Sequence, residues 1–197
     1  MHERDPNHEP NLHIYTSVEY SLPNDIIEHW WGIYDESFTQ INKNSPCRQS
    51  MYKDEFYIAM RSENIHKVVS YERGEPSAMM IFGPLSKNAD VFGWMSQDFY
   101  KKKYPRQSQS DSVLYFVGIF TDPNVRNQGN MSGLLTVGGQ VVKEHHPDAV
   151  VIFDCCDEND KWLPQTIHGL SKSLPGITVQ PIEKAGTQRY YGFEVSY

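Results

Sequence analysis

Residues 112–154 read SVLYFVGIFTDPNVRNQGNMSGLLTVGGQVVKEHHPDAVVIFD, two apolar runs separated by a polar turn and an amphipathic segment. The first run, 113–120, is apolar and aromatic without interruption, as is typical of a strand covered on both faces. The second run, 149–153, is too short to form a helix of its own. Apolar residues recur near one face over 130–145, and Pro147 ends that pattern. Two buried strands joined by a helix predict a parallel βαβ unit with a right-handed crossover.

The turn between the first strand and the helix is a candidate anion site. Thr121, Asp122 and Pro123 end the strand, and polar residues with one glycine, Gly129, open the helix. The first N–H groups of a helix have no internal partner, and the helix dipole favours negative charge beside them. An ordinary strand-to-helix turn of an α/β protein can also carry one glycine, so the loop alone leaves both interpretations open.

The loop resembles the pyrophosphate loop of the GCN5-related N-acetyltransferase superfamily, Gln/Arg-x-x-Gly-x-Gly/Ala, and Pro123 has the family's spacing from the arginine. This resemblance implies that acetyl-CoA binds with its pyrophosphate on the amides of the loop and its pantetheine along the end of the strand. The implied cofactor-binding residues are Ile119, Phe120, Thr121, Arg126, Asn127, Gln128, Gly129, Asn130, Met131 and Ser132. Two positions depart from the family pattern: Met131 replaces a small residue, and Ser171 replaces a frequent tyrosine.

The order of the remaining elements also agrees with that superfamily, over nearly the whole chain. Alternating and helical periodicities predict an initial strand, two helices and a β-hairpin before residue 113, then a helix and two antiparallel strands after residue 154. The predicted ranges are 12–18, 27–41, 52–64, 66–82, 157–170, 177–182 and 188–195. The tandem tryptophans Trp30 and Trp31 are assigned to the core rather than to a ligand. We therefore expect an α/β protein of the α+β type: a central mixed sheet with a βαβ cofactor unit, flanked by helices.

Length and composition set limits on the function. A chain of 197 residues predicts one domain over 12–197, after a flexible tail at 1–11. Residues 85–111 form an insertion or extended connection, because they exceed what a connection needs. The net charge of −7 argues against a nucleic-acid surface, and no apolar run has the length of a membrane span or signal peptide. With only three cysteines and no metal-ligand spacing, we expect a cytoplasmic protein without a metal.

Three functions remain open at this point. The resemblance implies an N-acetyltransferase in which an amine attacks the thioester of acetyl-CoA directly in a ternary complex. Met131 and Ser171 also permit a coenzyme A-binding or partner-binding module without turnover. A relative that uses a longer acyl donor is the third possibility, with 85–111 as its docking surface. The expected partner is a small-molecule or peptide amine, and a homodimer stays open.

The candidate base is Asp154. Many relatives carry a carboxylate on the cofactor strand, but residues 113–120 contain none. Asp154 ends the neighbouring strand, and the resemblance implies that this strand end lies within reach of the reacting amine. Burial among apolar neighbours would raise its pKa toward neutrality, as a base requires. Capping of the next helix is the alternative role for Asp154. Tyr190 and Tyr191 are the candidates for an acid or an oxyanion donor, with core packing as the alternative for one of them.

Overall fold

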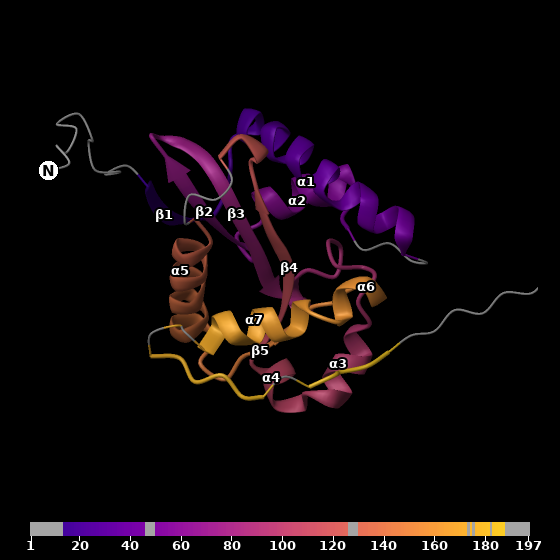
Figure 1. The fold of residues 1–197 in the computed structure, drawn as a ribbon. Coiled ribbons are helices and arrows are strands. Elements are labelled where there is room, and N and C mark those ends of the chain that lie inside the picture. Colours follow the sequence, from indigo (N-terminus) through magenta and orange to yellow (C-terminus); the bar gives the residue numbers. More distant parts are fainter. Residues whose placement is uncertain are drawn as a thin grey trace, which may run out of the picture.

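The computed structural model describes residues 14–45, 50–125, 130–172, 174, 176–181 and 183–187. Its centre is a five-stranded sheet in the order β1-β2-β3-β4-β5 (Figure 1). The strands are β1 Ile14–Glu19, β2 His66–Glu72, β3 Glu75–Pro84, β4 Val113–Thr121 and β5 Val150–Ile152. Strands β1 to β4 pair antiparallel, whereas β5 pairs parallel with β4. The predicted α/β fold with a mixed sheet and a βαβ unit is confirmed.

Helices cover both faces of this sheet. They are α1 Asn24–Asn44, α2 Lys53–Arg61, η1 Leu85–Lys87, α3 Gln97–Lys103, α4 Pro105–Gln109, η2 Pro123–Val125, α5 Asn130–His145, α6 Asp157–Asp160 and α7 Leu163–Lys172. Helices α1 and α2 lie on one face and α5 on the other (Figure 1). Residues 85–111 contain η1, α3 and α4 and lie at one end of the sheet, near β5. None of the described helices is long and apolar enough to cross a membrane.

The face under α1 and α2 holds the larger of two apolar clusters. Trp30, Tyr34 and Phe56 have no exposed surface and pack with Phe120 of β4. Trp31 is only partly buried, but it packs against the same cluster. The aromatic spacing of the sequence at three and four residues therefore marks the buried face of α1.

The opposite face is formed by α5, which approaches the sheet closely through glycines. A Cβ atom at Gly133 would lie 2.6 Å from Oγ1 of Thr16 on β1, and one at Gly138 would lie 1.9 Å from Cε of Met80 on β3. Both distances are far below van der Waals contact, so larger side chains would push the helix off the sheet. The distance of α5 from the sheet also sets the position of its N-terminus, which begins at Asn130.

Gly138→Leu should therefore lower the free energy of unfolding by about 1–3 kcal/mol, since it overpacks the interface between α5 and β3. Gly32→Leu is the matched control, because Gly32 lies exposed in α1 and its Cβ would contact nothing within 4 Å. The control should be neutral, or stabilising by up to about 1 kcal/mol through helix propensity. Urea unfolding of both variants measures the difference, and equal stability of the two would contradict this account of the interface.

The C-terminal third differs from the predicted elements in three ways. The single helix predicted from residue 157 is two helices, α6 and α7, because Pro164 fits only in a first turn and so starts a new one. Trp162 lies in the break and is 53% exposed, not on a buried apolar side. The predicted strand over 177–182 is absent from the described residues 177–181, and 188–195 lies outside the described part.

A group of histidines joins the start of β2 to the end of α5. The ring of His66 lies 5.0 Å from that of Phe82, 6.2 Å from that of His145 and 5.7 Å from that of His146. Burial first, and then the charges of His146, His145 and Lys67, lower the pKa of His66 to about 4. The folded protein therefore favours neutral His66.

Stability should fall as the pH drops from about 6.5 toward 4, because His66 binds its proton in the unfolded chain at a higher pH than in the folded chain. His66→Gln should show a smaller loss of melting temperature between pH 7 and pH 5 than the parent. Thermal melts over this range provide the measurement. An identical pH dependence in both proteins would show that His66 is not the group responsible.

Candidate functional site

The site lies where β4 and β5 separate. The two strands pair only over Val113–Tyr115 and Val150–Ile152, whereas β4 remains paired with β3 as far as Thr121. The register between β3 and β4 shifts opposite Val117, so β4 carries a bulge just beyond the last residue that β5 reaches. Gly118 follows the bulge with φ +156°, a conformation that other residues rarely adopt. The bulge bends β4 at the point where its second partner ends.

This separation leaves part of the edge of β4 without β5. From Phe116 to Thr121, β5 supplies no backbone partner to β4 within the described residues. Backbone N–H and C=O groups on a strand edge readily bind an extended chain that carries amides. The edge ends at Asp122, whose Oδ1 accepts a hydrogen bond from the amide of Asn124, at 2.8 Å. That turn leads toward the loop 126–129.

Asp154 and Tyr115 meet at the fork between the strands. Tyr115 pairs with Ile152, and Asp154 follows two residues later, which brings both side chains to the same face. The hydroxyl of Tyr115 donates a hydrogen bond to Oδ1 of Asp154. The N-cap position of α6 is Cys156, so the alternative in which Asp154 caps this helix is not what the structure shows.

Burial dominates the electrostatics of this pair. It raises the pKa of Asp154, while the hydrogen bond from Tyr115 opposes the rise. The pKa of Tyr115 is raised well above its usual value, first by burial and then by the charge and hydrogen bond of Asp154. Asp154 is therefore a partly buried carboxylate whose basicity is increased by its surroundings. A carboxylate with a raised pKa is a candidate for a proton acceptor.

Residues 85–111 supply the neighbouring aromatic side chains. Nε1 of Trp94 donates a hydrogen bond to the Tyr115 hydroxyl, at 3.2 Å. Tyr100 of α3 lies close enough that the charge of Asp154, after burial, raises its pKa. The ring of Tyr104 stacks on that of Tyr100 with a centroid distance of 6.5 Å. The excursion between β3 and β4 thus forms one wall of the site.

The segment 183–187 joins this wall to α6. Glu183 accepts a hydrogen bond from the Tyr104 hydroxyl at 2.7 Å and lies 3.5 Å from the Lys103 ammonium. The next residue, Lys184, forms an ion pair of 2.8 Å with Asp160 of α6. These exposed pairs contribute little stability individually, but together they hold the segment across the end of the sheet.

Cys155 follows the candidate base, yet its thiol is poorly suited to act as a nucleophile. Burial, and then the charges of Asp160 and Asp154, raise its pKa to about 11. Nucleophilic cysteines instead have a lowered pKa that makes the thiolate available. No group of histidine, cysteine or acidic side chains among the described residues is arranged to hold a metal ion.

The predicted cofactor-binding residues are only partly described. Ile119 and Thr121 are partly buried on β4, whereas the Phe120 side chain belongs to the core, so only its backbone is available to a ligand. Met131 begins α5 with a 44% exposed side chain, and Ser132 is also exposed. Six predicted site residues lie outside the described part of the chain: Arg126, Asn127, Gln128, Gly129, Tyr190 and Tyr191. For Asn130 the structure places only the backbone, at the start of α5.

Ser171, at the position of the family's frequent tyrosine, takes no part in this site. Its hydroxyl donates to the carbonyl of Ile167 in its own helix, at 2.8 Å. Sequence reasoning missed two residues that do belong to the site, Tyr115 and Trp94. A tyrosine within a buried strand was the available signal, because a buried hydroxyl needs a hydrogen-bond partner.

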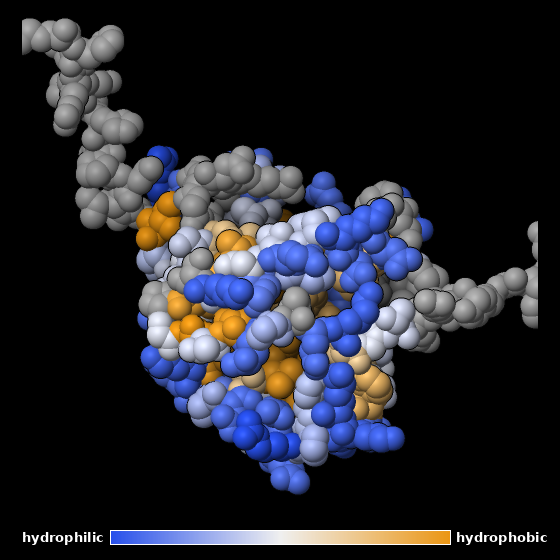
Figure 2. Space-filling model, turned by 60° about the horizontal axis from the view of Figure 1, so that its bottom comes forward, coloured by the Kyte–Doolittle hydropathy of each residue, from blue (hydrophilic) through white to orange (hydrophobic). Residues whose placement is uncertain are grey.

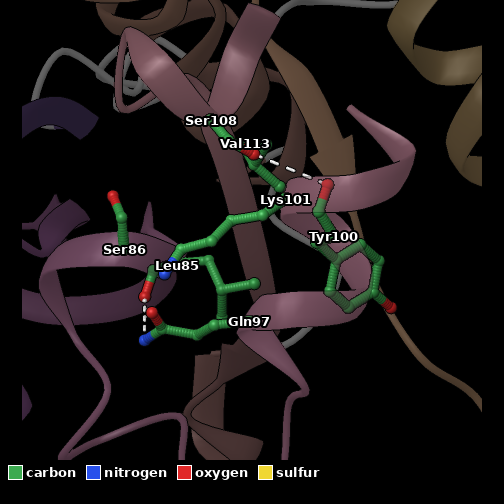
Figure 3. A pocket seen from close by; sticks show the side chains of 7 residues that line it. All are labelled: Leu85, Ser86, Gln97, Tyr100, Lys101, Ser108 and Val113. Atoms are coloured by element: carbon green, nitrogen blue, oxygen red, sulfur yellow. Dashed lines mark hydrogen bonds between the residues drawn. The ribbon is translucent and has the colours of Figure 1, made fainter. Parts of the chain in front are cut away.

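A small pocket lies beside the aromatic wall, between η1, α3, α4 and β4. Its lining residues are Leu85, Ser86, Gln97, Tyr100, Lys101, Ser108 and Val113. The Lys101 side chain runs across this pocket, whereas the Tyr100 ring turns away from it (Figure 3). On the face that contains this end of the sheet, hydrophilic side chains dominate and apolar ones show between them (Figure 2). Tyr100 thus belongs both to the lining of this pocket and to the surroundings of Asp154.

No protein-family model and no curated protein matches this chain. Solved structures similar to it include an aminoglycoside acetyltransferase from an uncultured soil metagenomic sample in complex with sisomicin, at 14% identity, 92% coverage of this chain, 97% of that chain and a TM-score of 0.48. A GCN5-related N-acetyltransferase from Ralstonia eutropha JMP134 has 13% identity, coverages of 88% and 99%, and a TM-score of 0.48. A possible acetyltransferase from Clostridium difficile 630 has 8% identity, coverages of 87% and 98%, and a TM-score of 0.49.

Proposed function

We propose that this protein is an N-acyltransferase of the GCN5-related superfamily, which transfers acetyl from acetyl-CoA to a primary amine. The observation that carries the proposal is the fork between β4 and β5, with the Asp154 carboxylate beside it. The resemblance of residues 126–131 to the pyrophosphate loop supports the same function.

The residues present fit acetyl-CoA as a substrate. The backbone from Phe116 to Thr121 offers hydrogen-bond groups at the strand edge to the amides of pantetheine. The N-terminus of α5 offers free N–H groups to the pyrophosphate. The Met131 side chain is 44% exposed, so packing against the rest of the protein does not require a small residue at this position.

The reaction requires positioning and one proton acceptor. Asp154 takes a proton from the ammonium form of the acceptor, directly or through a water, and so frees the nitrogen lone pair. The nitrogen then forms a bond to the thioester carbonyl carbon and the carbon–sulfur bond breaks. The proton that the nitrogen loses on becoming an amide goes to the departing thiolate, which leaves as the thiol of coenzyme A. No protein nucleophile is needed, which agrees with the raised pKa of the Cys155 thiol.

The acceptor is an amine, and the surroundings of Asp154 favour a cationic one. The negative charge of Asp154 attracts an ammonium group, and the net charge of −7 attracts cations to the whole molecule. The acceptor can be found by incubating the protein with acetyl-CoA and a panel of primary amines, following thiol release and identifying products by mass spectrometry. Absence of both thiol release and acetyl-CoA binding would overturn the proposal, whereas binding without turnover with any amine would favour a binding module.

Acetyl-CoA at about a hundred times its dissociation constant should stabilise the protein by roughly 2.7 kcal/mol. For a chain of this size that is roughly 5–10 °C in melting temperature. Gly129→Val should abolish this increase without unfolding the protein, because a β-branched side chain in the loop blocks the approach of phosphate to the backbone. Gly32→Val is the matched control in an exposed part of α1. A Gly129→Val protein that binds as well as the parent would place the anion site elsewhere.

Asp154→Asn should lower kcat/KM at neutral pH by about 10²–10⁴-fold, because the proton acceptor is lost. In the parent, activity should fall with decreasing pH as Asp154 becomes protonated, at a pKa above the ordinary value for aspartate. That acidic limb should be missing from the residual activity of Asp154→Asn. Asp157→Asn, an exposed residue at the start of α6, should retain the limb. Full activity of Asp154→Asn with an unchanged pH profile would make Asp154 a structural residue.

A further inference from the structure

We propose that Trp94 is a positioning residue for Asp154, acting through the Tyr115 hydroxyl to keep the carboxylate oriented and ionised. The proposal rests on the proposed function, in which Asp154 is the proton acceptor. It also assigns a role to the excursion 85–111, which carries Trp94 to the fork between β4 and β5.

The direction of the hydrogen bonds follows from the chemistry of the three groups. An indole N–H can only donate, and an ionised carboxylate can only accept. The Tyr115 hydroxyl has one proton, and its oxygen accepts the hydrogen bond from Trp94. Because Tyr115 is 2% exposed, this proton is directed to Asp154. The chain of donors therefore runs from Trp94 through Tyr115 to Asp154.

Aromatic packing fixes the geometry of this chain. The Trp94 and Tyr115 rings meet edge to face at 5.9 Å, with an interplanar angle of 76°. Phe92, which has no exposed surface, contacts both rings edge to face, at 6.2 Å and 5.0 Å. Edge-to-face contacts restrict ring orientation and so hold the indole N–H and the phenol oxygen in line. Trp94 is itself only partly buried, so its position depends on these contacts.

The chemical consequence concerns the protonation of Asp154. Hydrogen bonds donated to a carboxylate favour its charged form, and each donor in a chain polarises the next. Loss of the bond from Trp94 would weaken the donation from Tyr115 and let burial raise the pKa of Asp154 further. Among the described residues, the titratable groups that face Asp154 are Tyr115 from β4, Tyr100 from α3 and its chain neighbour Cys155. None of the three is a cation that could replace the lost donor.

The test is the pKa of Asp154 itself, measured by carboxyl carbon NMR titration of the whole protein without ligand. Tyr115→Phe should raise this pKa by about one to two units, because it removes a hydrogen bond to a charged group. Trp94→Phe keeps an aromatic ring but removes the N–H, and should raise it by about 0.2–0.5 units. Adding Trp94→Phe to Tyr115→Phe should cause no further rise, because the connecting hydroxyl is already gone.

Two variants serve as matched controls. Trp31→Phe makes the same change at a tryptophan of α1, and Tyr104→Phe removes a hydroxyl that donates to Glu183 instead. Both should leave the pKa of Asp154 unchanged. An unchanged or lowered pKa in Trp94→Phe would overturn the proposal.

The parent protein gives a second test that does not depend on the folding of any variant. The indole N–H resonance of Trp94 should shift with pH at the same midpoint as the Asp154 carboxyl, while that of Trp162 should not. Different midpoints would also overturn the proposal. Neither titration uses acetyl-CoA or an amine, so its failure is distinct from failure of the proposed function. If the protein neither binds acetyl-CoA nor acetylates an amine, but the pKa of Asp154 changes in the variants as expected, only the proposed function is contradicted.

Discussion

The limited pairing of β4 with β5 is the constraint on which the rest of the site depends. Three residue pairs join the strands, and the bulge beyond Tyr115 then turns β4 away while β3 keeps it in the sheet. A strand that is hydrogen-bonded along one edge keeps its place in the sheet, and its other edge can bind an extended ligand. The same separation brings the end of β5, and with it Asp154, beside the free edge.

The polar groups at this fork are held by an apolar and aromatic environment. Burial alone would favour protonated Asp154, whereas the hydroxyl of Tyr115 favours the carboxylate, so the pKa of Asp154 reflects two opposing effects. The aromatic wall from residues 85–111 packs against one side of the fork and supplies Trp94 as a further donor. The excursion that lengthens the connection between β3 and β4 is therefore part of the site.

Helix α5 packs closely against the face of the sheet opposite α1 and α2. Gly133 and Gly138 bring its axis close to β1 and β3, and this close approach determines where its N-terminus points. A helix packed through side chains of ordinary size would stand farther from the sheet, and its N-terminus would move with it. The glycines of α5 thus affect the site although none of them lies near Asp154.

The sequence by itself determined the two apolar runs, the helix between them, the hairpin before them and the position of Asp154 at a strand end. These features depend on local periodicity and turn residues, which act over a few neighbours. Only the tertiary structure decided the division at Pro164, the exposure of Trp162 and the lack of a strand over 177–181. It alone also brought Trp94, Tyr115 and Asp154 together. These three residues are far apart in the chain, and a hydrogen bond between them follows from strand register and ring packing, which no local pattern encodes.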